Sequence, residues 1–271
     1  MTCRKDFISD DVKENVGTQS LSLMALCQVP SRERQRPGSN VFRLLFVFAA
    51  ASAFAANPIR IDVSQEKPGA EPKQFLGVVG DWFVVQNENR SVLMVDGRKW
   101  KNGQPAGGLA DKARAIYGSR HEEFIDNVKA FAYFPYAVAQ GVDDFHNGEI
   151  SMKFQIVDGA LDQCAGILFN LKSNGDYLTV RFNGKEDNLV LWTFNKGVRK
   201  FVKRGSEEWP LNMHQWYSMK IVVKGTQLEG YLNDRKLLDY TLPEPVSGRV
   251  GVWSKTDSVS YFDAFTVTQE R

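Results

Sequence analysis

The sequence predicts an all-β fold, a two-sheet antiparallel sandwich of the jelly-roll type, because three observations agree. From residue 75 onward, apolar and polar residues alternate in short runs, as in strands that bury only one face. Gly, Asn and Asp separate these runs, and these residues tolerate the positive φ of tight turns. The 271 residues are 43% hydrophobic and 12% aromatic, which is enough for a sizeable core. We therefore expect many short strands packed in two layers.

The first forty residues do not share this pattern. Residues 1–40 show neither helical nor alternating periodicity and are rich in Ser, Arg and Gln. Such a composition does not support a packed core, so we expect an unstructured leader. Because a secretory signal normally stands at the extreme N-terminus, an over-extended gene start, with initiation near Val41, would account for this leader.

Residues 41–55 read as a signal peptide. The stretch 44–53 is continuously apolar, follows Arg32, Arg34, Arg36 and Arg43, and runs into Ala53-Phe54-Ala55, a cleavage site of the A-x-A type. A buried core helix is the alternative, but a core helix is amphipathic and this stretch is apolar on every side. At about ten residues it is shorter than the ~20 that a spanning helix needs. We expect a secreted or periplasmic protein whose mature domain, residues 56–271, has no membrane span.

The strands of this domain follow from period-two runs in four places. Apolar residues occupy every second position in 150–156 and 178–182, and they recur in 219–223 and at Leu228 and Leu232. Turn residues at 174–176, 183–188 and 233–235 connect neighbouring runs. The runs therefore predict antiparallel strands joined by tight turns.

One insertion around residues 108–138 breaks the alternation. Ser119 with Glu122 forms a capping-box pattern, and Phe124, Ile125 and Val128 follow at helical spacing. We expect a short helix and an ordered loop that pack against the sandwich. The aromatic residues of this insertion are expected in the core rather than in a binding site: Phe131, Tyr133, Phe134 and Tyr136.

Charge and cysteine usage exclude several classes of function. Removal of residues 1–55 leaves a nearly neutral domain, without the basic footprint of a nucleic-acid-binding protein. Polyanions and anionic membranes would demand a clustered positive face, so they too are poor partners. Cys164 is the one cysteine of the mature chain, which makes an intramolecular disulfide impossible. It lies in an apolar run and is expected as a small buried residue rather than a reactive thiol.

Two stretches carry a family resemblance. The first contains residues 165–169, Tyr177, Arg181, Asn183, residues 186–188 and residues 197–199, and the second contains residues 248–259 and 261–263. Over roughly residues 148–267 the sequence resembles exported bacterial domains of the concanavalin A-like lectin/glucanase superfamily, above all laminin-G-like domains and the 3-keto-disaccharide hydrolase type. The resemblance implies a jelly roll with a concave sheet that faces carbohydrate. It does not imply catalysis, because the fold hosts lectins, adhesion modules and enzymes.

Motifs for enzymatic chemistry are weak. A retaining glucanase of family 16 needs two carboxylates about 5 Å apart, and its pattern Glu-x-Asp-x-x-Glu is absent. His121-Glu122 opens like a zinc-protease helix, but Ile125 stands where the second histidine would be. No cofactor is expected. A structural Ca²⁺, as in lectin relatives, stays open, with four carboxylates as candidate ligands: Asp143, Asp144, Asp176 and Asp187.

The strongest candidate site follows from the alternation in 177–183. If Leu178, Val180 and Phe182 point into the core, the residues between them must point outward. An exposed row of Tyr, Arg and Asn suits sugars, because rings stack on a pyranose and polar groups bind its hydroxyls. The candidate ligand-binding residues are Tyr177, Arg181, Asn183, Glu186, Asn188 and Arg199, with a second cluster of Trp253, Lys255 and Asp257. The alternative is a solvated sheet face with turn caps, and Trp253 in the core.

Three functions remain open on the sequence. The leading hypothesis is an exported carbohydrate-binding domain that holds an oligo- or polysaccharide on the concave sheet. The second, implied by the resemblance, is hydrolysis or lyase-type cleavage of a 3-keto-glycoside or another oxidised saccharide, with Glu186 or Asp187 as the base. The third is an interaction domain of the cell envelope without a sugar site.

Overall fold

The computed structural model describes residues 57–99, 109–126 and 133–270. The predicted leader, the predicted signal peptide, Val128 and Phe131 lie outside these residues. None of the helices in the described ranges is long and apolar enough to cross a membrane.

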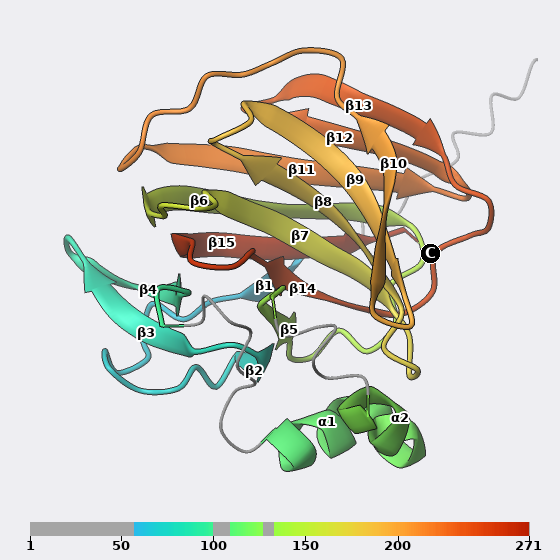
Figure 1. Cartoon of the computed structure of the whole chain (residues 1–271), viewed down its shortest axis with the longest axis horizontal. Coiled ribbons are helices and arrows are strands. Elements are labelled where there is room, and N and C mark those ends of the chain that lie inside the picture. Colours follow the sequence, from blue (N-terminus) through green and yellow to red (C-terminus); the bar gives the residue numbers. More distant parts are fainter. Residues whose placement is uncertain (1–56, 100–108, 127–132, 271) are drawn as a thin grey trace, which may run out of the picture. The chain divides into compact units, whose positions relative to one another are not determined.

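Two antiparallel sheets face each other (Figure 1). In the described residues, the eight-stranded sheet has the order β13-β12-β11-β6-β15-β4-β3, and β1 also pairs with β15. Its strands are β1 (Ile59–Ile61), β3 (Trp82–Asn87), β4 (Arg90–Asp96), β6 (Gly148–Asp158), β11 (Trp216–Lys224), β12 (Gln227–Leu232), β13 (Arg235–Thr241) and β15 (Val259–Gln269).

The seven-stranded sheet has the order β10-β9-β8-β7-β14-β5-β2 within the same ranges. Its strands are β2 (Phe75–Val79), β5 (Tyr136–Ala139), β7 (Cys164–Leu171), β8 (Tyr177–Asn183), β9 (Asn188–Asn195), β10 (Val198–Arg204) and β14 (Arg249–Trp253). Sequence-distant strands pair inside both sheets, as in the β11–β6 and β14–β7 ladders. The predicted all-β two-sheet jelly roll is therefore confirmed.

The main core lies between the sheets and follows the predicted alternation. Met152 and Phe154 of β6 are buried there with Val180 and Phe182 of β8. The rings of Phe154 and Phe182 lie 6.2 Å apart, one from each sheet. The other face of β8 therefore points away from the space between the sheets.

The insertion forms more helix than the sequence predicts. Helix α1 (Leu109–Tyr117) and a 3₁₀ turn (Gly118–Arg120) precede helix α2 (His121–Asp126), so Ser119 lies in the turn and not at the start of a helix. As an N-cap, Ser119 would start the helix at residue 120, so the capping-box pattern places the start of α2 one residue too early. The spacing of Ala113, Ile116 and Tyr117, all three buried, is the helical signal for α1.

Both helices pack beside the seven-stranded sheet. Helix α1 contacts β2, and Figure 1 shows α1 and α2 next to β2 and β5. The rings of Tyr117 and Phe124 lie 4.7 Å apart and tilted, and both residues share a second apolar cluster with Tyr136, Tyr177 and Trp253. A face that an isolated sandwich would expose to solvent is therefore partly covered.

Candidate functional site

Strand register decides which side chains share the outer face of the seven-stranded sheet. Tyr177 pairs with Phe194, Thr179 with Trp192, and Arg181 with Val190. Directly paired residues point to the same face, so Phe194 and Trp192 join Tyr177 and Arg181 there. On β10, Arg199 pairs with Phe194 and Phe201 pairs with Trp192, which places both on this face too.

One region of this face is filled by aromatic side chains, which we call the covered aromatic cluster: Tyr136, Tyr177, Phe194 and Trp253. Tyr177 and Phe194 stack at 4.3 Å, and Trp253 donates its indole N–H to the Tyr177 hydroxyl at 3.1 Å. Tyr136 bonds to the hydroxyl of Tyr117 on α1. Burial raises the pKa of Tyr177 well above its ordinary value, so this phenol stays neutral. These contacts are those of a core.

The prediction of an exposed row on β8 is therefore wrong. Tyr177 is 2% exposed, and Arg181 and Asn183 are each 1% exposed. Alternation sets which face a side chain points to, but not what covers that face. Helices α1 and α2 pack over the Tyr177 end, while Phe134 meets Phe194 edge-on at 5.0 Å and stacks on Trp253 at 5.9 Å.

Arg181 connects the covered region to the open region. Its guanidinium donates to the amide oxygen of Asn188 at 2.7 Å and to the Glu186 carboxylate at 2.8 Å. Its Nε has no partner among the described residues. Gly166 makes room for it on the neighbouring strand, since a Cβ there would lie 2.9 Å from the Cβ of Arg181.

Glu186 is the more exposed partner of the Arg181–Glu186 ion pair, with 45% of its side chain exposed. Partial burial raises its pKa, but hydrogen bonds and the charge of Arg181, together with a bond from Asn188, outweigh burial and lower the pKa. The carboxylate is ionised at neutral pH. It can accept hydrogen bonds or act as a base, but it cannot serve as a proton donor.

Next to Glu186 lies the open region, which we call the arginine–tryptophan patch: Glu186, Trp192, Arg199 and Phe201. The guanidinium carbon of Arg199 lies 4.3 Å from the Trp192 ring centre and 5.1 Å from that of Phe134. Phe201 meets Trp192 edge-on at 5.7 Å and is 59% exposed. Burial and the charge of Arg181 lower the pKa of Arg199. The patch thus offers apolar ring surface, hydrogen-bond donors and a carboxylate side by side.

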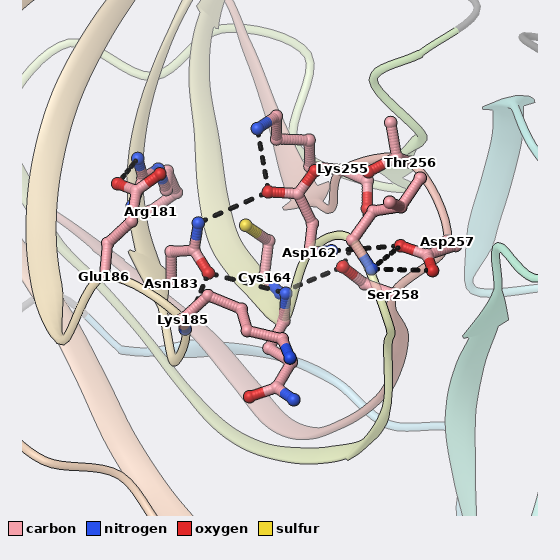
Figure 2. A network of polar contacts seen from close by, with 12 residues as sticks. Asp162, Cys164, Arg181, Asn183, Lys185, Glu186, Lys255, Thr256, Asp257 and Ser258 are labelled. Atoms are coloured by element: carbon pink, nitrogen blue, oxygen red, sulfur yellow. Dashed lines mark hydrogen bonds and ion pairs between the residues drawn. The ribbon is translucent and has the colours of Figure 1, made fainter. Parts of the chain in front are cut away.

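Asp162 links Asn183 and Lys255, as Figure 2 shows. It accepts from the Lys255 ammonium at 2.7 Å and from the Asn183 amide at 3.3 Å, and Thr256 donates to its other oxygen. Asp162 is almost buried, and sequence reasoning missed it because only the fold brings its loop to β8 and to the residues after β14. Lys255 and Asn183 are therefore held by Asp162 rather than free on a surface.

Asp257 acts as a clamp for the loop that carries Asp162. Its carboxylate accepts backbone N–H groups from Ala160, Leu161 and Asp162 at 2.9 to 3.1 Å. Burial raises its pKa, but these bonds together lower it. Although it was predicted as a ligand contact, the described contacts of Asp257 hold backbone in place (Figure 2).

Cys164 is buried beside this network, as predicted. Its backbone N–H donates to the Ser258 hydroxyl at 3.0 Å, and burial raises the pKa of its thiol to about 12. A thiol with such a pKa is not a nucleophile at neutral pH.

The candidate calcium ligands do not come together in the described part of the chain, where no three His, Cys, Asp or Glu side chains form a metal-binding group. Asp143 pairs with Arg249, and Asp144 pairs with His146. Asp176 accepts the backbone N–H of Lys196 in a turn, and Asp187 is a turn residue with φ of 50°. The calcium site stays a prediction.

The fold therefore divides the predicted residues into three groups. Arg181, Glu186, Asn188 and Arg199 come together at the arginine–tryptophan patch. Tyr177 and Trp253 lie in the covered aromatic cluster, while Asn183, Lys255 and Asp257 belong to the network around Asp162. Sequence reasoning missed Trp192 and Phe201, although Trp192 stands two residues from Phe194 in an alternating strand.

Comparison with solved structures identifies the fold. The carbohydrate-binding module CBM66 from Bacillus subtilis matches with a TM-score of 0.50 at 13% identity, over 72% of this chain and 96% of that chain. A Bacillus subtilis protein of unknown function with a galectin-like fold matches with a TM-score of 0.41 at 14% identity, over 50% of this chain and 77% of that one. A Bacillus licheniformis β-glucanase matches with a TM-score of 0.38 at 10% identity, over 51% and 71%. No protein-family model and no curated protein matches the sequence. The chain has the concanavalin A-like jelly-roll fold.

Proposed function

We propose that this protein binds carbohydrate at the arginine–tryptophan patch. One observation carries the proposal: Phe201, 59% exposed, and Arg199 both rest on the indole of Trp192. Exposed aromatic rings beside charged hydrogen-bonding groups are what a pyranose needs, because its two faces are apolar and its rim carries hydroxyls.

Each group of the patch has a role in this proposal. Phe201 stacks on the sugar ring while Trp192 supports Phe201 and Arg199, Arg199 donates hydrogen bonds, and the ionised Glu186 accepts them from hydroxyls. Arg181 and Asn188 hold Glu186 in place from below, at 2.8 and 3.2 Å. Prior positioning of Glu186 lowers the entropy that binding would otherwise cost.

The fold is compatible with binding, because the similar CBM66 structure is that of a carbohydrate-binding module. The chemistry favours binding over hydrolysis, because the lowered pKa of Glu186 keeps this carboxylate ionised and so not poised to donate a proton. Tyr177, Trp253 and Asp257 stay outside the proposed binding surface, since their contacts lie in the interior.

Affinity electrophoresis of the full chain in gels that contain neutral and acidic polysaccharides tests the proposal. We expect retardation by at least one polysaccharide and its loss in Trp192→Ala. The matched control is Trp216→Ala on the eight-stranded sheet, where Arg90 lies 5.7 Å from the ring centre. A Trp216→Ala variant that loses binding while Trp192→Ala retains it would place the site on the opposite sheet. No retardation by any glycan would remove the proposal.

We also propose that the protein works outside the cytoplasm, in the periplasm or beyond the cell. The support is the apolar stretch 44–53 with its preceding arginines and the A-x-A site at 53–55. N-terminal sequencing of the protein from fractionated cells should give a chain that begins at Ala56. A chain that starts upstream and stays in the cytoplasm would contradict export.

A further inference from the structure

We infer that the saccharide bound at the arginine–tryptophan patch is acidic, and that a carboxylate on its ring pairs with the guanidinium of Arg199. This inference rests on the proposed function. It narrows the ligand to polymers or oligomers that contain uronate residues.

The first argument is that the side chain of Arg199 has no polar partner among the described residues. Its described contacts are the faces of Trp192 and Phe134, and none of its N–H groups donates to a described residue. The N–H groups of a guanidinium lie in its plane, so stacking on a ring leaves them free at its edge. A planar fork of two N–H donors matches the two oxygens of a carboxylate.

The second argument is the charge balance around the patch. Glu186 is paired with Arg181, and Asp162 is paired with Lys255. Among the described residues, this leaves Arg199 as a partly buried cation in no salt bridge, close enough to Arg181 for repulsion that the more weakly felt carboxylates of Asp162 and Glu186 oppose. A neutral sugar would accept from its N–H groups only, whereas a uronate would accept from them and also supply the missing ion-pair partner.

The third argument is the sequence of the hairpin that carries Arg199. Residues 188–204 contain no Asp or Glu and several basic residues: Lys196, Arg199, Lys200, Lys203 and Arg204. Residues 56–271 are nearly neutral as a whole, but the β9–β10 hairpin carries a local excess of positive charge, even though Arg204 is paired with Glu208. Such a cluster attracts a polyanion at long range and accelerates its association.

Two buried donors that have no partner among the described residues also favour a ligand with acceptor oxygens. The Arg181 Nε and the Trp192 indole N–H are buried and have no partner among the described residues. Both belong to the stack beneath Arg199, since Arg181 and Arg199 each lie over the Trp192 ring. Because a buried donor without a partner destabilises the fold, the stack gains from a ligand that brings acceptor oxygens and lets these groups rearrange toward them.

The experiment uses the full chain and pairs of ligands that differ only in charge. Galacturonate, mannuronate and glucuronate oligosaccharides are each compared with their methyl esters by isothermal titration calorimetry. We expect at least one acid to bind, with a loss of about ten-fold or more on esterification, because the ester keeps the ring but loses the charge-assisted pair. The affinity of the acid should also fall with added salt.

The outcomes separate the two levels of the proposal. Equal affinity for an acid and its ester, or binding of neutral glycans alone, would overturn the acidic ligand but leave carbohydrate binding in place. Preference for sulfated galactans over all uronates would overturn the carboxylate in favour of a sulfate ester. No binding to any acidic or neutral glycan would overturn both.

Substitutions on β10 test which positive charge selects the acidic ligand. Arg199→Gln should abolish the difference between acid and ester, and Arg199→Lys should keep part of it, because it retains the charge but loses the planar fork. Arg204→Gln is the matched control, since it removes the same charge from β10 but its guanidinium is already paired with Glu208 at 2.9 Å. An equal loss in Arg204→Gln and Arg199→Gln would show that general charge, and not a pair at Arg199, selects the acid.

Discussion

The outer face of the seven-stranded sheet has two regions that use similar residues for different ends. In the covered aromatic cluster, Trp253 is fully buried, and its indole N–H is bonded to Tyr177. In the arginine–tryptophan patch, Trp192 is partly exposed, and its indole N–H has no partner among the described residues. A core satisfies its polar groups internally, whereas the patch leaves this donor unmatched, as a site that binds a polar ligand would.

The difference also separates two kinds of evidence for a site. Aromatic and polar residues on one sheet face are not enough, because both regions have them. Exposure together with unmatched charge or donors distinguishes the patch, as Phe201 and Arg199 show. The predictions below test this distinction, starting with the largest effect.

The largest effect is expected for Trp253→Ala. Loss of this buried ring should lower the free energy of unfolding by about 3–5 kcal/mol, because it leaves a cavity and removes the indole N–H that donates to the Tyr177 hydroxyl. Chemical denaturation of the full chain measures it. Trp192→Ala is the comparison and should cost far less stability while it removes glycan binding. Equal destabilisation by the two variants would erase the distinction between the regions.

A second test contrasts two carboxylates, Asp257 and Glu186. Asp257→Ala should cost about 3 kcal/mol, because three backbone N–H groups of the 160–162 loop lose a charged acceptor in the interior. Since folding lowers the pKa of Asp257, its contribution is present at neutral pH and is lost as the pH falls below about 4. Denaturant titrations at pH 7 and pH 3 should show the wild type and the variant converging at the lower pH. A gap that stays constant would mean that Asp257 acts by packing and not by charge.

A third test removes an exposed ring from the patch. Phe201→Ala should weaken glycan binding by about ten-fold, the effect of one stacking ring, and should change stability by less than about 0.5 kcal/mol. Val198→Ala on the same strand is the control, since Val198 is 56% exposed but points to the opposite face. Calorimetry with the tightest-binding glycan measures the affinity, and a thermal melt measures the stability. Loss of binding in Val198→Ala as well would place the ligand on the edge of β10 rather than on its outer face.

The smallest effect is expected for Glu186→Gln. Its pKa is lowered in the fold, so the wild type should gain stability from ionised Glu186 above about pH 4.5 and lose it as the pH falls through the lowered value. Since 45% of the side chain is exposed, solvent screens the pair, and the gain should stay below about 1 kcal/mol. Melting curves of both proteins from pH 7 to pH 3 measure it. A larger difference in stability between the two proteins would mean that solvent screens the Arg181–Glu186 pair less than the 45% exposure of Glu186 implies.

The sequence predicted the strands and the direction of their side chains. The alternation in β8 correctly placed Val180 and Phe182 between the sheets and Arg181 on the outer face, because side-chain direction in a strand has a fixed period of two. It also placed Arg181, Glu186, Asn188 and Arg199 in one candidate site, and the fold brings these four together. The assignment of a ligand to them stays a prediction.

Exposure could not be derived in the same way. Whether Tyr177 faces solvent depends on α1, α2 and Phe134, and whether Lys255 is free depends on Asp162, about ninety residues earlier in the chain. Trp192 and Phe201 became site residues only through the pairing of β8, β9 and β10. Local sequence therefore determined the two-layer fold and the face of each residue through backbone periodicity. The tertiary structure alone decided which part of that face is core and which part is open, because burial depends on contacts between segments that are distant in sequence.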